Sequence, residues 1–142
     1  MITYVDTSTL LKLVIDEDGS ERVELIWNSA DVLASASMLV VEARAALAAA
    51  ERAGRLTAAQ HREAEAAFEA LVGGLTLVEI TGDLIGQAAD LAEEEALRGD
   101  DAVHLPAALT IEATMMTSAD AALCDAVERR GLHVANPLEA DV

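Results

Sequence analysis

The sequence predicts an α/β fold in which a central, mainly parallel β-sheet is flanked by helices on both faces. Short apolar segments alternate with longer helical segments, the pattern of parallel strands joined by crossover helices. The short segments are apolar at nearly every position, as expected for strands whose two faces are both covered. The length of 142 residues is that of one domain.

Five segments are expected to form the strands of this sheet. They are Ile2–Val5, Val32–Ala34, Leu75–Ile80, Thr114–Met116 and His133–Ala135. In open parallel sheets, ligands bind beyond the carboxyl ends of the strands. The residues that follow these segments are therefore the first place to look for a functional site.

Helix starts and ends are marked between the predicted strands. Thr57 and Thr81 each precede a long run with helical spacing of apolar residues, and threonine is a favoured N-cap. Glycine, which tolerates the left-handed backbone of a helix C-terminus, predicts helix ends at Gly54, Gly73, Gly74 and Gly131.

The charge balance is strongly acidic, with 9 Lys and Arg against 26 Asp and Glu and a net charge of −17. Non-specific binding to nucleic acid depends on Lys and Arg that neutralise phosphates, so the chain is not expected to coat itself with RNA or anionic lipid. Affinity for divalent cations, a basic protein partner and simple solubility remain as explanations.

Nothing in the sequence predicts export or membrane insertion. The first residues lack a basic region and reach an acid at Asp6, unlike a signal peptide. The stretch from Leu33 to Ala50 is interrupted by Glu42 and Arg44, which makes it a poor transmembrane helix. Cys124 is the single cysteine and cannot form an internal disulfide. We expect a soluble, cytoplasmic protein.

Four carboxylates are the candidate site residues: Asp6, Glu42, Asp101 and Asp120. Asp6 follows a predicted strand directly, and Asp120 lies just beyond another. Each has a simpler explanation, because Asp6, Asp120 and the pair Asp100-Asp101 could cap helices. Glu42, which we place on an apolar helix face, could form an ion pair with Arg44 or a distant arginine, or could lie at the edge of that face.

Convergence of these acids would require a counter-charge. Two carboxylates about 4 Å apart repel by about 4 kcal/mol at an effective dielectric of 20. Either some of the acids are protonated or a divalent cation neutralises them. An all-oxygen ligand set favours Mg²⁺ or Mn²⁺ over zinc.

Four segments, in order, resemble the motifs of the PIN domain, and most closely those of the VapC toxins of bacterial toxin–antitoxin pairs. The first is YVDTSTLLKLVIDEDGS, which contains Asp6, and the second is LVVEARAAL, which contains Glu42. The third is DAVHLPAAL, which begins at Asp101, and the last comprises TSADAAL around Asp120 and the later GLHVANP. The resemblance covers nearly the whole chain.

This resemblance implies a single PIN-like nuclease domain over residues 1–137 with a short tail over residues 138–142. It assigns metal binding and catalysis to Asp6, Glu42, Asp101 and Asp120, with Mg²⁺ as cofactor and Mn²⁺ as a possible substitute. The motif register favours Asp101 over its neighbour Asp100, and Asp120 is the acid on which the family depends least. Ser8 and Thr117 would line the site in supporting roles.

The activity implied is that of an endoribonuclease toxin. A metal-activated water would cleave RNA and leave 5′-phosphate and 3′-hydroxyl ends. The implied partners are an antitoxin with a basic tail and a second copy of the chain in a homodimer. The basic residues placed to face RNA are Lys12, Arg44, Arg52, Arg55 and Arg98, although each could equally be a solvated or ion-paired surface residue.

One departure from the family concerns Pro106, which stands where alanine is usual. Proline suits only the first turn of a helix, so we expect this helix to start after Asp101 or to kink. His104 is expected to be a buried, hydrogen-bonded structural residue. Cys124, Trp27 and Phe68 are expected to pack in or against the core.

Other enzyme classes fit less well. A haloacid-dehalogenase-type phosphatase needs a second Asp two residues after the first, where this chain has Ser8. A response-regulator receiver needs paired acids before the first strand and a distant lysine, whereas Lys12 is the only lysine here. The alternative from another class is a catalytically silent PIN-like protein-binding module.

Overall fold

The sheet is fully parallel, as the sequence predicts. The computed structural model describes residues 1–139. Its strands are β1 (Ile2–Val5), β2 (Val32–Ala36), β3 (Thr76–Val78), β4 (Met115–Thr117) and β5 (His133–Ala135), in the order β3-β2-β1-β4-β5. The predicted bounds of β1 and β5 agree with the structure. β2 is two residues longer, β3 keeps only the middle of its predicted segment, and β4 begins one residue later.

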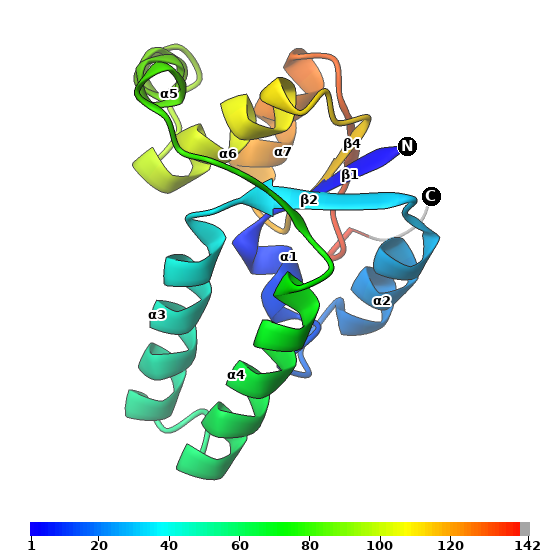
Figure 1. Ribbon diagram of the computed structural model, residues 1–142, viewed down its shortest axis with the longest axis vertical. Coiled ribbons are helices and arrows are strands. Elements are labelled where there is room, and N and C mark those ends of the chain that lie inside the picture. Colours follow the sequence, from blue (N-terminus) through cyan, green and yellow to red (C-terminus); the bar gives the residue numbers. More distant parts are fainter. Residues whose placement is uncertain (140–142) are drawn as a thin grey trace.

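Seven helices complete the described part of the chain (Figure 1). They are α1 (Thr7–Leu11), α2 (Ser20–Ser29), α3 (Leu39–Arg52), α4 (Ala58–Val72), α5 (Gly82–Glu94), α6 (Gly99–Thr110) and α7 (Ala121–Arg129).

The two faces of the sheet support two separate cores. Tyr4 and Val5 are neighbours on β1 and point to opposite faces, as successive strand residues must. Tyr4 packs with Leu105 and Leu123, so α6 and α7 cover its face together with α5. Val5 packs with Leu39 and Phe68, so α3 and α4 cover the other face with α1. The prediction of helices on both faces is therefore confirmed.

The predicted helix boundaries are confirmed where caps specify them. Thr57 and Gln60 form a reciprocal capping box at the start of α4, and Thr81 accepts a bond from the backbone N–H of Leu84 at the start of α5. Gly54 and Gly131 follow α3 and α7 with φ of 77° and 90°, a left-handed backbone that glycine adopts without steric cost.

Pro106 does not delay the start of α6. The helix begins at Gly99, before Asp101, and contains Pro106 in its interior, so the expectation of a later start is wrong. The prolyl nitrogen has no hydrogen and cannot bond the carbonyl four residues earlier. The surrounding residues Leu105, Ala107 and Ala108 are fully buried, and this packing holds the helix together across the missing bond.

Three further expectations from the sequence concern core packing, membrane insertion and the chain end. Phe68 and Cys124 are buried, and Trp27 packs against the second core, as predicted. No helix among residues 1–139 is long and apolar enough to cross a membrane. The proposed tail over residues 138–142 falls largely outside the described residues, and the domain boundary stays a prediction.

Candidate active site

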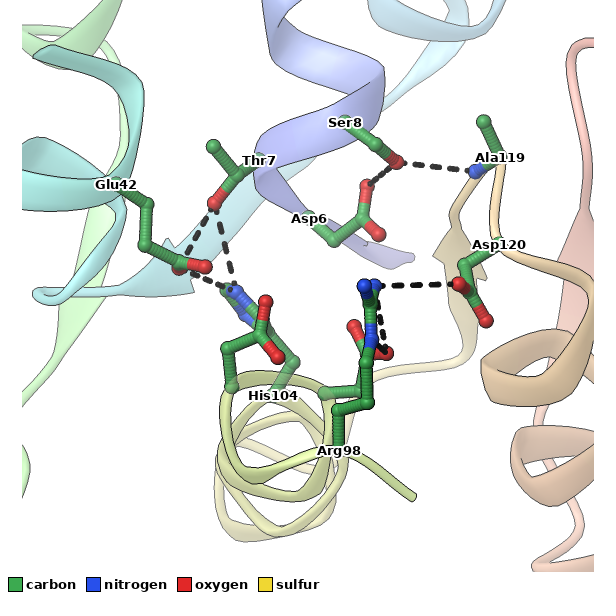
Figure 2. Close-up of a pocket in the computed structure, with 10 residues that line it drawn as sticks. Asp6, Thr7, Ser8, Glu42, Arg98, His104, Ala119 and Asp120 are labelled. Atoms are coloured by element: carbon green, nitrogen blue, oxygen red, sulfur yellow. Dashed lines mark hydrogen bonds and ion pairs between the residues drawn. The ribbon is translucent and has the colours of Figure 1, made fainter. Parts of the chain in front are cut away.

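The carboxyl ends of β1 and β4 open into a cavity of about 210 Å³ (Figure 2). All four predicted carboxylates line it. The lining residues are Asp6, Thr7, Ser8, Glu42, Arg98, Asp100, Asp101, His104, Ala119 and Asp120, and together they are called the acidic pocket below. The structure thus brings together acids that lie as far as 114 positions apart in the sequence (120 − 6).

Asp6 is the most firmly held acid of the acidic pocket. Its side chain caps α1 by accepting a 3.0 Å bond from the backbone N–H of Thr9. Ser8 donates to the same oxygen over 2.8 Å, and Ser118 donates to the other oxygen over 2.6 Å. The residue is only 3% exposed. The capping explanation is therefore correct, and the same bonds fix both carboxylate oxygens at the edge of the pocket.

Ser8 and Ser118 join the ends of β1 and β4. Ser8 accepts a bond from the backbone N–H of Ala119, and Ser118 accepts one from the backbone N–H of Asp120. Asp120 in turn caps α7 through a 2.9 Å bond from the N–H of Leu123. These hydroxyls set the position of Asp120 relative to Asp6.

Thr117 does not have the supporting role at the pocket that the resemblance implies. It is buried, its hydroxyl lies 3.4 Å from that of Thr9, and it does not line the pocket. The hydroxyl that supports the site belongs to the next residue, Ser118, which is also buried behind the lining and acts through its bond to Asp6. Adjacent residues at a strand end point in opposite directions, so the exact end of the strand decides which of the two side chains reaches Asp6, and the sequence does not fix that end to one residue.

Glu42 is held by Thr7 and His104. The Thr7 hydroxyl donates to one Glu42 oxygen over 2.9 Å, and Nε2 of His104 lies 2.8 Å from the same oxygen. The other ring nitrogen of His104 lies 2.7 Å from the Tyr4 hydroxyl. His104 is therefore the buried, hydrogen-bonded residue that the sequence predicts, and it also orients a pocket carboxylate.

Two expectations about the surroundings of Glu42 are wrong, and the alternative of an edge position is confirmed. The buried face of α3 carries Leu39, Ala43 and Leu47, so Glu42 lies at the margin of the core and not on its apolar face. Arg44 pairs with Glu65 on α4 over 2.6 Å and not with Glu42. Each residue of a helix is rotated by about 100° from the one before it, so Arg44, two residues after Glu42, lies about 200° round the helix from it.

The Glu42–His104 pair is polarised towards the charged forms. Burial disfavours the charge on each partner, but the hydrogen bond and the attraction between them outweigh it. As a result, the pKa of Glu42 is lowered and the pKa of His104 is raised.

Asp101 lies in the first turn of α6 and lines the pocket. Burial, and then the charges of Asp100 and Asp120, raise its pKa to about 6. The guanidinium of Arg98 partly offsets this effect. Its Nη2 lies 3.4 Å from an Asp101 oxygen and 3.5 Å from an Asp120 oxygen. Arg98 thus bridges two of the acids across the pocket mouth (Figure 2).

The donor set fits a hard divalent cation, although the ligands are not yet gathered round one point. All four acids offer oxygen ligands, which suit Mg²⁺ or Mn²⁺. Within residues 1–139, however, no three His, Cys, Asp or Glu side chains stand close enough together to hold a metal ion directly. Mg²⁺ usually keeps several waters and binds through one or two carboxylates. A cavity of about 210 Å³ has room for a cation with part of its water shell.

Comparison of the sequence with known proteins finds a matching protein family. The sequence signature of the PIN domain matches residues 3–128, which include all four acids. The chain is 37% identical over 132 residues to Ribonuclease VapC45 of Mycobacterium tuberculosis (strain CDC 1551 / Oshkosh). That match covers 93% of this chain and 87% of the relative.

Solved structures show the same fold at lower identity. The toxin VapC20 of Mycobacterium tuberculosis, which cleaves the sarcin–ricin loop, superimposes with a TM-score of 0.68 at 18% identity, over 92% of this chain and 95% of its own. A chain of a toxin–antitoxin complex from Klebsiella pneumoniae gives a TM-score of 0.67 at 14% identity, over 97% of this chain and 99% of its own. At these identities, the likeness is one of fold.

Proposed function

The chain belongs to the PIN domain family, among the VapC ribonucleases, and from that premise we propose that it is a metal-dependent endoribonuclease acting as the toxin of a toxin–antitoxin pair. The observation that supports this most strongly is the convergence of Asp6, Glu42, Asp101 and Asp120 on one pocket at the carboxyl ends of the strands. Mg²⁺, or Mn²⁺ in its place, would be held by these acids.

A bound divalent cation would supply an activated water and stabilise the negative charge that develops on the phosphodiester oxygens. The side chains of the protein position the acids that would hold the cation. Ser8 and Ser118 hold Asp6, while Thr7 and His104 hold Glu42, so two acids are oriented before any ligand arrives. Preorganised ligands avoid the cost of ordering them during the reaction.

The acidity of the chain favours a basic protein partner. A net charge of −17 repels the RNA backbone in general but attracts a chain rich in Arg and Lys. We propose that an antitoxin with a basic tail neutralises the acidic pocket, in line with the toxin–antitoxin complex that shares the fold. We also propose that the toxin is a homodimer, which light scattering of the purified chain would test.

The competing function is a silent binding module. In such a protein Asp6 would still cap α1, but Asp101 would be costly to keep, because it is only 7% exposed and lies near the charges of Asp100 and Asp120. This argument favours the enzyme.

The test is cleavage of RNA by the purified chain, freed from any partner. Structured RNAs, including ribosomal and transfer RNA, are incubated with Mg²⁺ or Mn²⁺, and the new ends are sequenced. Cleavage that stops with EDTA and with Asp6→Asn, but not with Asp90→Asn on the exposed face of α5, is the expected result. Cleavage that survives EDTA and Asp6→Asn would rule the mechanism out.

A further inference from the structure

Arg98 is the one permanently cationic side chain among the described residues that line the acidic pocket. It faces five carboxyl groups there: Asp6, Glu42, Asp100, Asp101 and Asp120. The other basic group, His104, is already committed to Glu42. The charge of Arg98 therefore acts mainly on Asp101 and Asp120, the two acids that it contacts.

The contacts of Arg98 are loose. Its Nε and Nη2 atoms each lie 3.4 Å from an Asp101 oxygen, and Nη2 lies 3.5 Å from an Asp120 oxygen. Strong charge-assisted bonds are 2.7–2.9 Å long, and Arg129 reaches Glu95 over 2.5 and 2.8 Å in the same molecule. The Arg98 side chain is also 74% exposed. Arg98 therefore offsets the negative charge of Asp101 and Asp120 without short hydrogen bonds that would fix its position.

The fold does not need the Arg98 side chain where it lies. Arg98 occupies the N-cap position of α6, but its side chain makes no capping bond. Figure 2 shows its guanidinium below the carboxylate of Asp6 and beside that of Asp120, to which a dashed line joins it. A cation bound by Asp101 or Asp120 would approach the same oxygen atoms that the guanidinium contacts.

We infer that Arg98 is the resident counter-ion of Asp101 and Asp120, and that a divalent cation must displace it from the acidic pocket. Two cations cannot share the same carboxylate oxygens without strong repulsion. The displaced guanidinium stays tethered at the pocket mouth, where a phosphate of the RNA would be its next partner. Arg98 is thus a positioning residue that links metal binding to substrate binding. The inference rests on the proposed function, because it assumes that these acids bind the metal.

The test measures Mn²⁺ binding by electron paramagnetic resonance, with no RNA present. The protein variants are wild type, Arg98→Gln, Arg98→Lys, Arg55→Gln and Asp6→Asn. Arg55 lies in the turn after α3, about three helical turns from Glu42, so Arg55→Gln removes the same charge far from the pocket. Circular dichroism in EDTA checks that each variant is folded.

Arg98→Gln is expected to lower the Kd for Mn²⁺ by about three- to tenfold, since two exposed ion pairs no longer compete with the metal. Arg98→Lys keeps the charge and is expected to stay closer to wild type, so a gain in Arg98→Lys as large as that in Arg98→Gln would overturn the counter-ion role. Arg55→Gln should match wild type. A purely structural role for Arg98 would instead leave Mn²⁺ affinity unchanged or weaken it.

The two proposals fail in different ways. Unchanged or weaker Mn²⁺ binding in Arg98→Gln, while Asp6→Asn abolishes binding, would overturn the counter-ion role alone. A matching gain in Arg55→Gln would do the same, because it would reduce the effect to net charge. Absence of Mn²⁺ binding to the wild-type pocket would overturn the proposed metal-dependent function itself.

Discussion

The two sides of the acidic pocket are built differently. On one side, Asp6 and Glu42 are held by bonds of 2.6–3.0 Å from hydroxyl, backbone and imidazole groups. On the other side, Asp101 and Asp120 meet an exposed arginine at 3.4–3.5 Å. Hydrogen bonds preorganise the first side. On the second side, Asp120 keeps one short bond, its 2.9 Å cap of α7, whereas the contact of Asp101 with Arg98 is one of charge that another cation can replace. The contrast suggests that one side anchors a metal and the other adapts to it.

The most damaging change to the preorganised side is Asp6→Asn. Asparagine keeps one oxygen for the cap of α1 but loses the charge, so we expect Mn²⁺ affinity and RNA cleavage to fall by more than about 100-fold with little change in stability. Titration calorimetry and a cleavage assay measure the two effects, with Asp90→Asn as the matched control. Retained affinity would show that Asp6 is only a helix cap.

His104→Ala should have the largest effect on stability. It leaves the Tyr4 hydroxyl and Glu42 without their shared partner, and we expect a loss of about 2–3 kcal/mol in the free energy of unfolding. Urea unfolding measures it. Tyr4→Phe removes the bond between the Tyr4 hydroxyl and His104 but keeps the one between His104 and Glu42, so it should cost about 1 kcal/mol. Equal losses in the two variants would contradict the role of His104 in holding Glu42.

Ser118→Ala tests the hydroxyl that links Asp6 to Asp120. Removing it should weaken metal affinity by about tenfold, as is usual for groups that orient metal ligands. The matched control is Ser29→Ala, which removes an exposed hydroxyl at the end of α2. An effect no larger than that of Ser29→Ala would show that Asp6 does not depend on this bond.

The smallest effect is expected for Asp100→Asn on the adaptable side. Asp100 is exposed and adds to the repulsion on Asp101, whereas Asp101 is largely buried and contacts Arg98. We expect Mn²⁺ affinity to change by less than about threefold, in line with a single exposed charge pair. Asp101→Asn should weaken Mn²⁺ affinity far more in the same assay. A larger loss in Asp100→Asn would make Asp100, and not Asp101, the metal ligand.

Much of this pocket follows from the sequence because strand ends are easy to recognise. Asp6 and Asp120 lie just beyond apolar segments, and parallel strands bring such positions to one edge of the sheet. Glu42 and Asp101 stand out as an acid in an apolar stretch and an acid at a helix start, the family motifs assign them to the site, and the structure places both at the same pocket. The fold itself followed from alternating apolar and helical segments.

The errors have a common cause in side-chain direction. Thr117 is expected to line the site and Ser118 is not predicted, because a single residue of strand register decides which of the two side chains reaches Asp6. Glu42 was placed on the core face of α3 because its alanine neighbours are apolar yet lie partly exposed. The bridging position of Arg98 depends on a long side chain reaching across from the start of α6, which no local pattern encodes.

The most direct measurement of the central claim is an anomalous difference map from crystals of the chain grown with Mn²⁺. The account predicts a Mn²⁺ peak in the acidic pocket next to Asp6, with Asp101 or Asp120 drawn towards it and the Arg98 side chain moved outwards. Protein that cleaves RNA in Mn²⁺ but shows no Mn²⁺ peak in this pocket would contradict the account.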